Sequence, residues 1–215
     1  MNVIITGTAS GIGEAAAKKF LREGHKVFGF DVYKSTIEDP SYTHFMMDIR
    51  DEDLPEIPEA EIIINSAGTI REESAIDVNL QGTMRFTENY VGSESLRSLL
   101  FICSASARNG AEFPYYVASK AGLVGYMKNQ ALNLAKRGIT VNSISPGGVI
   151  TPLNQHILDD PKLYEAVLNE TLLGKWAEPE EIAELAYYLT VINRSMTGED
   201  ILVDNGEMLR SNFIW

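Results

Sequence analysis

The amino-acid sequence predicts an α/β fold, a doubly wound parallel sheet of about seven strands with helices on both faces. Short apolar runs alternate with longer segments of helical period along the whole chain. Residues 61–65 and 99–103 are continuously apolar, as expected for strands that are buried on both faces. Strands that alternate with helices imply right-handed crossovers and parallel pairing. The 215 residues suffice for one buried core, so we expect a single domain over 1–215.

The elements follow one another in a regular order. A helix is expected at 11–23, where Ile12, Ala16 and Phe20 recur every four residues. A longer helix is expected at 116–136, with Leu123, Met127, Ala131 and Leu134 along one side. The expected strands are 2–6, 26–31, 43–47, 61–65, 99–103, 139–144 and 199–203.

Two connections between these elements are short, so the crossovers are trimmed. Residues 50–60 carry Pro55 and Pro58, which makes a full helix there improbable. Only ten residues separate Gly68 from Asn79, too few for a long helix and its loops.

Composition excludes several classes of function. The net charge is −12, and such a surface repels nucleic acid and anionic lipid, so we expect neither as a partner. The chain has no apolar run long enough for a membrane span, and it starts directly with a strand-like run instead of a secretory signal. Cys103 is the only cysteine, which fits a reducing compartment; we therefore expect a cytoplasmic protein.

Metal binding is not expected from the histidines. His25, His44 and His156 lie far apart in the sequence, and none has a partner at metal-ligand spacing.

A glycine-rich turn follows the first expected strand. Gly7, Gly11 and Gly13 stand between that strand and the first helix. Glycines permit a tight turn and let backbone N–H groups approach a pyrophosphate, while the helix N-terminus favours the anion. A glycine triplet alone is weak evidence, but its strand–turn–helix context indicates a dinucleotide site.

Asp31 ends the second strand and indicates which dinucleotide binds. A carboxylate there accepts hydrogen bonds from the adenosine ribose of NAD and repels the 2′-phosphate of NADP. The glycine-rich turn has no arginine or lysine, and Lys34 lies three residues beyond the strand end, away from the position of Asp31. We therefore expect NAD, although an Asp at this place also serves as a simple turn former.

Tyr116 and Lys120 are the candidate catalytic pair. They are four residues apart at the start of a helix and therefore share one face. A nearby ammonium favours the phenolate of a tyrosine, so the pair can take a proton from an alcohol or give one to a carbonyl. Ser104, just beyond the run 99–103, is placed to hold the substrate oxygen. Ser106 is its competitor for that role.

These residues together resemble the short-chain dehydrogenase/reductase family, over nearly the whole chain. The family's motifs are matched, in order, by Thr6–Gly13 (TGTASGIG), Asn65–Gly68 (NSAG), Asn79 in Asp77-Val78-Asn79-Leu80, Tyr116–Lys120 (YVASK), Asn142–Thr151 (NSISPGGVIT), Trp176–Ala183 (WAEPEEIA) and Thr197–Gly206 (TGEDILVDNG). Ser66 departs from the family's second asparagine, and the Ser104–Tyr116 spacing is one residue shorter than usual.

The resemblance implies a Rossmann fold and a role for each matched residue. The catalytic residues would be Asn79, Ser104, Tyr116 and Lys120, with Asn79 holding a water that relays protons to Lys120. Asp48 and Ile49 would contact adenine, and Thr151 with backbone Val149 would hold the carboxamide. The expected cofactor-binding residues are Gly7, Ser10, Gly11, Ile12, Gly13, Asp31, Asp48, Ile49, Asn65, Ala67, Gly68, Tyr116, Lys120, Pro146, Gly147, Val149 and Thr151.

We expect an NAD-dependent oxidoreductase acting on a secondary alcohol or ketone. The alternatives are a dinucleotide sensor without chemistry and a carrier-protein-linked 3-oxoacyl reductase; the latter docks an acidic protein and needs a basic patch. Residues 152–175 are expected to form an apolar lid that suits a medium-sized apolar substrate. Homo-oligomers, dimers or tetramers, are implied through 116–136 and the helix near 79–90. The lid's apolar residues are Leu153, Ile157, Leu158, Leu163, Tyr164, Val167, Leu168, Leu172 and Leu173.

Overall fold

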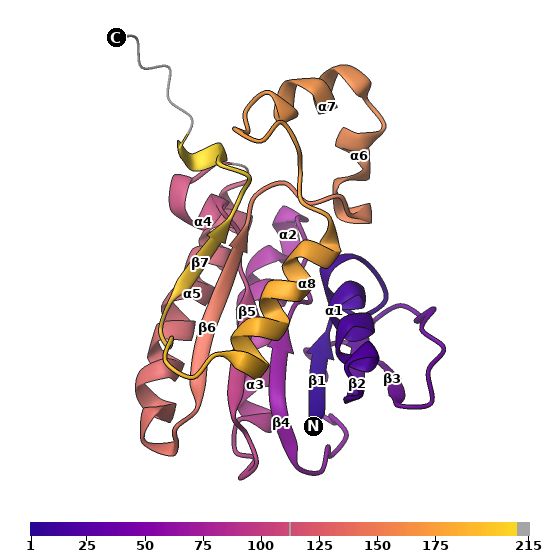
Figure 1. Ribbon diagram of the computed structural model, residues 1–215, viewed down its shortest axis with the longest axis vertical. Helices are drawn as coiled ribbons and strands as arrows, with labels where there is room; N and C mark the ends of the chain where they lie inside the picture. The colour runs from indigo at the N-terminus through magenta and orange to yellow at the C-terminus, as the bar shows by residue number, and fades with distance from the viewer. Residues whose placement is uncertain (112, 210–215) are drawn as a thin grey trace.

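A seven-stranded parallel sheet forms the centre of the computed structural model, which describes residues 1–111 and 113–209 (Figure 1). The strand order β3-β2-β1-β4-β5-β6-β7 is that of a doubly wound sheet, so the predicted fold class is confirmed. Every strand lies within two residues of its expected range. The strands are β1 (Asn2–Thr6), β2 (Lys26–Asp31), β3 (Tyr42–Met46), β4 (Ala60–Asn65), β5 (Ser98–Ile102), β6 (Thr140–Pro146) and β7 (Asp200–Val203).

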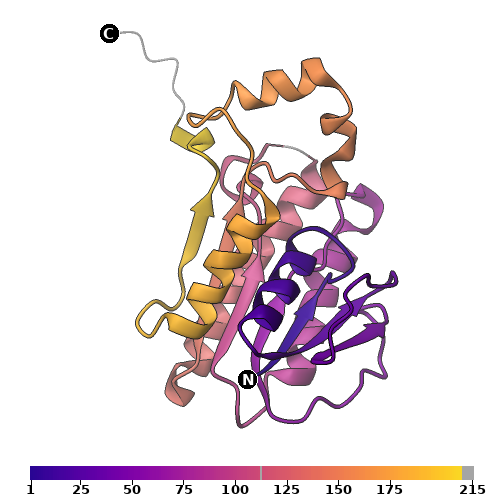
Figure 2. The same cartoon turned by 45° about the vertical axis from the view of Figure 1, so that its right-hand side comes forward.

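Helices cover both faces of the sheet. On one face lie α1 (Gly11–Arg22) and α8 (Pro179–Tyr187), and on the other lie α3 (Thr83–Tyr90) and α5 (Pro114–Leu134) (Figures 1 and 2). Each face has its own apolar cluster. Because both sides of the central strands are covered, these strands are apolar at nearly every position.

The alternation of side chains along β1 illustrates this burial. Val3 and Ile5 pack into the cluster under α1 and α8, where Phe20 of α1 is fully buried. Ile4 points the other way, into the cluster with Phe86 of α3. Strand geometry, with successive side chains on opposite faces, divides one apolar run between two cores.

The trimmed crossovers expected from the sequence are present. The β2–β3 link (32–41) and the β3–β4 link (47–59) contain no helix, so the expectation for 50–60 is confirmed. Between Gly68 and Asn79 stands only the single turn α2 (Glu72–Ala75). It runs directly into a π-helical segment, Ile76–Gly82, and then into α3; the sequence did not predict this segment.

The long helix differs slightly from its expected range of 116–136. Helix α5 begins two residues earlier, because Pro114 suits the first turn of a helix, where its missing N–H is not needed. It ends at Leu134, and a 3₁₀ turn (Ala135–Arg137) with Gly138 in the left-handed region follows. The shorter helices are α4 (Ser106–Asn109), α6 (Gln155–Leu158) and α7 (Pro161–Leu168).

Within 1–111 and 113–209, every helix is too short or too polar to cross a membrane.

The strand order reverses between β1 and β4, because the chain crosses from β3 at one edge to β4 on the far side of β1. The carboxyl ends of β1 and β4 therefore part at this point and leave room for a ligand. Helices α6 and α7 stand above the same end of the sheet (Figures 1 and 2).

Candidate active site

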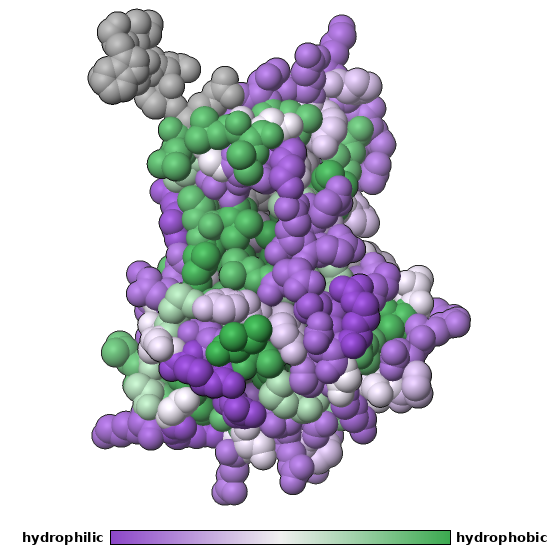
Figure 3. Space-filling model, in the orientation of Figure 1, coloured by the Kyte–Doolittle hydropathy of each residue, from purple (hydrophilic) through white to green (hydrophobic). Residues whose placement is uncertain are grey.

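A cavity of about 1100 Å³ opens at the carboxyl ends of the strands. Its walls come from the ends of β1, β2, β4, β5 and β6, from the start of α5 and from the segment 152–175. Apolar side chains gather where the α6–α7 segment meets the body of the molecule (Figure 3). All the expected site residues except Asn65 and Asn79 line this cavity.

The glycine-rich turn forms one end of the cavity. Gly7 adopts φ +77°, a region that favours glycine, and its N–H donates to the carbonyl of Phe30 on β2 (2.7 Å). A Cβ on Gly13 would lie only 2.1 Å from the carbonyl oxygen of Gly7. The turn therefore accepts no side chain at Gly13, which keeps the start of α1 and its N–H groups at the cavity wall.

Asp31 faces the cavity beside this turn. Its Oδ2 accepts the backbone N–H of Ala9 (2.9 Å), and its Oδ1 accepts the N–H of Tyr33 (2.9 Å). Because Ala9 lies within the glycine-rich turn, the Asp31 carboxylate holds this turn in place. It also gives the cavity wall a negative charge. Lys34 lines a separate small pocket with Thr36 and Glu38 and does not line the main cavity.

A second carboxylate, Asp48, follows β3 and is held by an arginine. Arg50 donates to it from Nε (2.9 Å) and from Nη2 (2.7 Å), and the guanidinium lowers the pKa of Asp48 below its ordinary value. The Nη1 of Arg50 donates to Asp77 in the π-helical segment (2.6 Å). Asp48 and Ile49 both line the cavity, as expected, but the sequence did not point to Arg50.

The ends of β1 and β4 are joined by one threonine hydroxyl. The Oγ1 of Thr6 accepts the N–H groups of Ser66 and Ala67, both at 3.0 Å. Asn65, expected among the cofactor-binding residues, is buried, and its amide donates to Thr87 of α3 (3.1 Å). Its side chain thus lies behind the cavity wall.

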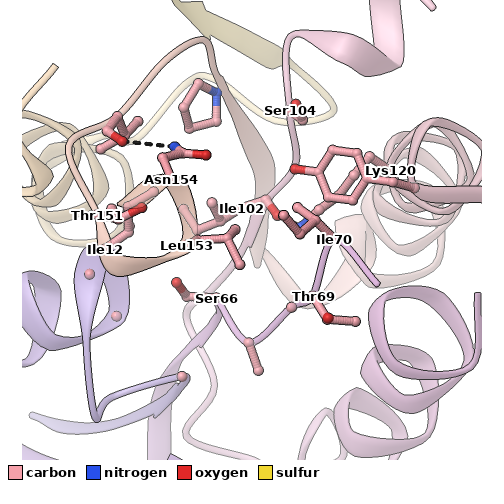
Figure 4. Close-up of a pocket in the computed structure, with 18 of the residues that line it drawn as sticks. Ile12, Ser66, Thr69, Ile70, Ile102, Ser104, Lys120, Thr151, Leu153 and Asn154 are labelled. Atoms are coloured by element: carbon pink, nitrogen blue, oxygen red, sulfur yellow. Dashed lines mark hydrogen bonds between the residues drawn. The ribbon is translucent and has the colours of Figure 1, made fainter. Parts of the chain in front are cut away.

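Tyr116 and Lys120 lie at the start of α5, and both line the cavity. Figure 4 shows Lys120 on the wall opposite Thr151, Leu153 and Asn154. The Nζ of Lys120 donates to the carbonyl of Ile102 (2.9 Å) and lies 5.8 Å from the centre of the Tyr116 ring. Both side chains are buried, so the ammonium lies beside the phenol away from bulk water. This is the shared face that the spacing predicts.

Glu72 fixes the start of this helix. Its carboxylate accepts the backbone N–H groups of Tyr115 (3.3 Å) and Tyr116 (3.2 Å). These N–H groups have no partner within the helix, and a negative charge is favourable at a helix N-terminus. Glu72 has no signal in the sequence, because it lies 43 and 44 residues from the two N–H groups that it accepts.

Asn79 is fully buried within the π-helical segment and does not line the cavity. It accepts the N–H of Thr69 (2.7 Å) and donates to the carbonyl of Thr69 (2.9 Å) and to Ser119 (3.0 Å). A Cβ on Gly68 would lie 3.2 Å from Oδ1 of Asn79 and 3.3 Å from Nζ of Lys120. The side-chain ends of Asn79 and Lys120 thus both lie close to Gly68.

The β5 side of the cavity carries Ser104 and Ser106. Both are buried, and both line the cavity. Pairing with β6 continues past the end of β5, since the N–H of Ala105 donates to the carbonyl of Pro146 (2.7 Å). Burial raises the pKa of the neighbouring Cys103 thiol to about 12, so this thiol stays protonated at neutral pH.

The wall opposite α5 is formed by residues that follow β6. A Cβ on Gly148 would lie 2.1 Å from Nε1 of Trp176, so the indole rests directly on that glycine. The amide of Asn154 donates to the carbonyl of Val149 (2.9 Å), the contact drawn in Figure 4. Of the apolar residues expected in the lid, three line the cavity: Leu153, Ile157 and Val167.

Glu207 adds a carboxylate that is not among the residues expected from the sequence. It lines the cavity against Gly147, where a Cβ would lie 3.0 Å from Oε2 of Glu207. Burial, and then the charges of Asp204 and Glu170, raise the pKa of Glu207. Its position directly after the motif Thr197–Gly206 is the signal that could have found it.

Comparisons with known proteins find oxidoreductases of similar sequence and fold. The model of a protein family described as enoyl-(acyl carrier protein) reductase matches residues 62–207. The chain is 31% identical to the uncharacterized oxidoreductase YxbG of Bacillus subtilis, over 95% of this chain and 90% of that protein. It is 29% identical to the 3-oxoacyl-[acyl-carrier-protein] reductase FabG of Thermotoga maritima, over 94% and 96%. The fold is similar to that of the ligand-free aldohexose dehydrogenase of Thermoplasma acidophilum, with a TM-score of 0.87, 24% identity and coverage of 100% and 96%.

Proposed function

Because the chain belongs to the short-chain dehydrogenase/reductase family, we propose that it transfers a hydride between NAD(H) and a secondary alcohol or ketone. The observation that carries this proposal is the pairing of Tyr116 with Lys120 in a cavity whose other end holds Asp31 and the glycine-rich turn. One end has a proton-transfer group, and the other has the features that suit a dinucleotide.

The polar groups at the wall of the cavity suit NAD. The glycine-rich turn leaves backbone N–H groups free of side chains for the pyrophosphate, and Asp31 offers a carboxylate to the adenosine ribose. When bound, NAD supplies the atom that accepts or donates the hydride. Asp31 supports NAD over NADP, because a 2′-phosphate beside this carboxylate would be repelled.

We assign the proton transfer to Tyr116. Its hydroxyl takes the proton of an alcohol as the substrate is oxidised, or gives a proton to a carbonyl oxygen as the substrate is reduced. The Lys120 ammonium favours the phenolate by its charge and is held in place by the Ile102 carbonyl. Ser104 donates a hydrogen bond to the substrate oxygen, and Asn79 holds a water that relays protons to Lys120.

The segment 152–175 is proposed as the lid of this cavity, within one domain that spans the chain. Leu153, Ile157 and Val167 give it an apolar inner side, which supports a medium-sized apolar substrate. We also propose a cytoplasmic homodimer or homotetramer that packs through α3 and α5. Leu132 of α5 supports this interface, because 79% of its surface is exposed; light scattering measures the assembly.

A second candidate function is a carrier-protein-linked 3-oxoacyl reductase. The similarity to the Thermotoga maritima protein favours it. The net charge of −12 opposes it, since an acidic carrier protein docks on a basic surface. A third candidate, a sensor that binds the dinucleotide without chemistry, leaves the buried Tyr116–Lys120 pair without a purpose.

The test is NADH formation by the purified protein with NAD and a panel of secondary alcohols, and NADH consumption with ketones and an acetoacetyl thioester. We expect Tyr116→Phe to abolish turnover while NADH still binds, measured by its fluorescence. Tyr115→Phe is the matched control, because Tyr115 precedes it on the same helix but is exposed and lies outside the cavity lining. Turnover that survives in Tyr116→Phe would refute the assigned base, and NADH binding without any turnover would favour the sensor.

A further inference from the structure

Ser106 lies beside the substrate-binding serine and has no role in the proposed reaction. It starts the short helix α4, is 3% exposed and lines the cavity. We infer that Ser106 is a positioning residue that makes Ser104 a pure hydrogen-bond donor toward the substrate oxygen. This inference rests on the proposed function and adds to it a limit on the substrate.

Two hydrogen bonds from Ser106 end on the same oxygen atom. The hydroxyl of Ser106 donates to Oγ of Ser104 (2.8 Å), and the backbone N–H of Ser106 donates to that oxygen as well (3.2 Å). A serine hydroxyl has two acceptor lone pairs and one proton. With both lone pairs occupied, only the proton of Ser104 remains for a third partner in the cavity.

This arrangement suits an oxygen substrate in both directions. A carbonyl oxygen has two lone pairs and can accept from Ser104 and from Tyr116 together. An alcohol oxygen can accept from Ser104 while its own proton passes to Tyr116. A protonated amine can only donate, so it would face the Ser104 proton without a partner. The serine pair therefore favours alcohols and ketones over protonated amines.

The platform that carries Ser106 is anchored to the edge of the sheet. Arg108 of α4 donates from Nε to Oδ2 of Asp200 on β7 (2.9 Å) and from Nη2 to the carbonyl of Asp200. The other carboxylate oxygen of Asp200 accepts the hydroxyls of Ser143 and Ser145 on β6, both at 2.7 Å. This contact anchors α4, and Ser106 with it, to β6 and β7.

The experiment is a double-mutant cycle on turnover of the best alcohol in the panel, with Ser104→Ala, Ser106→Ala and the double variant. Removal of one hydroxyl leaves the fold intact, which the thermal midpoint and NADH fluorescence verify. We expect Ser104→Ala to lower kcat on the order of 100-fold. Ser106→Ala should lower kcat about 10-fold, the loss of one hydrogen bond, with KM for NAD unchanged. Ser93→Ala is the control, because the hydroxyl of Ser93 also donates a hydrogen bond, to the carbonyl of Ala60 (2.8 Å), but Ser93 lies outside the cavity lining.

The decisive result is the double variant. If Ser106 acts through Ser104, the double variant has the kcat of Ser104→Ala, because there is nothing left to position. Multiplied losses would mean that Ser106 contacts the substrate itself, and an unchanged kcat in Ser106→Ala would mean that Ser104 is oriented without it; either result overturns the inference. A wild-type protein without turnover would instead refute the proposed function.

Discussion

The carboxylate of Asp31 offers the sharpest test of cofactor choice, through the substitution Asp31→Asn. In the structure each of its two oxygens accepts one backbone N–H at 2.9 Å, from Ala9 and from Tyr33. An asparagine amide has one acceptor oxygen, so one of these N–H groups would meet an NH₂ group instead. The substitution thus changes a hydrogen bond and a charge at once, and the two effects have different signatures.

The lost hydrogen bond loosens the glycine-rich turn, which weakens the binding of NAD and of NADP alike. A hydrogen bond to a charged group contributes about 1.5–3 kcal/mol, and the partial exposure of Asp31 favours the lower figure, so binding of both cofactors should weaken about 10-fold. The lost charge acts differently on the two cofactors, because it removes the repulsion of the 2′-phosphate of NADP and weakens the hydrogen bonds from the ribose of NAD. Repulsion between the carboxylate and a 2′-phosphate about 5 Å away amounts to about 1–2 kcal/mol in water, so the preference for NAD over NADP should fall about 10-fold.

The assay is kcat/KM for NAD and for NADP with one alcohol, in the wild type, in Asp31→Asn and in Glu38→Gln. Glu38 is an exposed acid in the same link, so its variant carries the same change in net charge without contacting the turn. A ratio of kcat/KM for NAD to that for NADP that is equal in Asp31→Asn and in the wild type would refute the role of this charge, and so would an equal shift in Glu38→Gln.

Three further predictions concern the fold and the cavity. A Cβ on Gly13 would lie 2.1 Å from the carbonyl oxygen of Gly7, so Gly13→Ala should weaken NADH binding at least about 10-fold in a fluorescence titration, and unchanged affinity would count against the assigned turn. Phe20 is fully buried, so Phe20→Ala should lower the free energy of unfolding by about 3–5 kcal/mol in a denaturant titration, and a loss below about 1 kcal/mol would contradict its place in the core. Burial raises the pKa of Glu207, so the folded protein binds its proton more tightly than the unfolded chain does, and the ionised carboxylate destabilises the fold at pH above the folded pKa. Glu207→Gln should therefore raise the thermal midpoint at pH 7, with the gain fading as pH falls through the raised pKa toward the ordinary value of 4.5; a gain that is constant with pH would exclude this cause.

Most of the sheet could be predicted from local sequence alone. The runs that became β4 and β5 are apolar throughout, and such runs have few alternatives to a strand covered on both faces. The glycine-rich turn and the Tyr116–Lys120 pair were also predictable, because each depends on residues that are close in sequence. Pro114 carries a local signal for the start of α5 that the expected range of 116–136 overlooked.

The contacts that position the site were not predictable, because they join distant segments. Glu72 reaches the start of α5, Arg50 reaches Asp77, and Arg108 reaches Asp200 across 92 residues. A charged side chain gives no sequence signal of its partner, and most charged residues are simply solvated. The π-helical segment was missed for a related reason, since one extra residue per turn hardly changes the apolar pattern.

That segment makes the position of Asn79 depend on a count of residues. A π-turn contains one residue more than an α-turn, so removal of one residue from 76–82 would restore a regular helix. Every residue on one side of the deletion would then rotate by about 100° relative to the other side. Asn79 and Thr83 are both buried, and a deletion between them would rotate Asn79 by about 100° relative to Thr83 and to Phe86, which faces the sheet. A single-residue deletion in this segment would thus leave the composition of the site intact while turning Asn79 away from Lys120, so the segment's length belongs to the site as much as its side chains do.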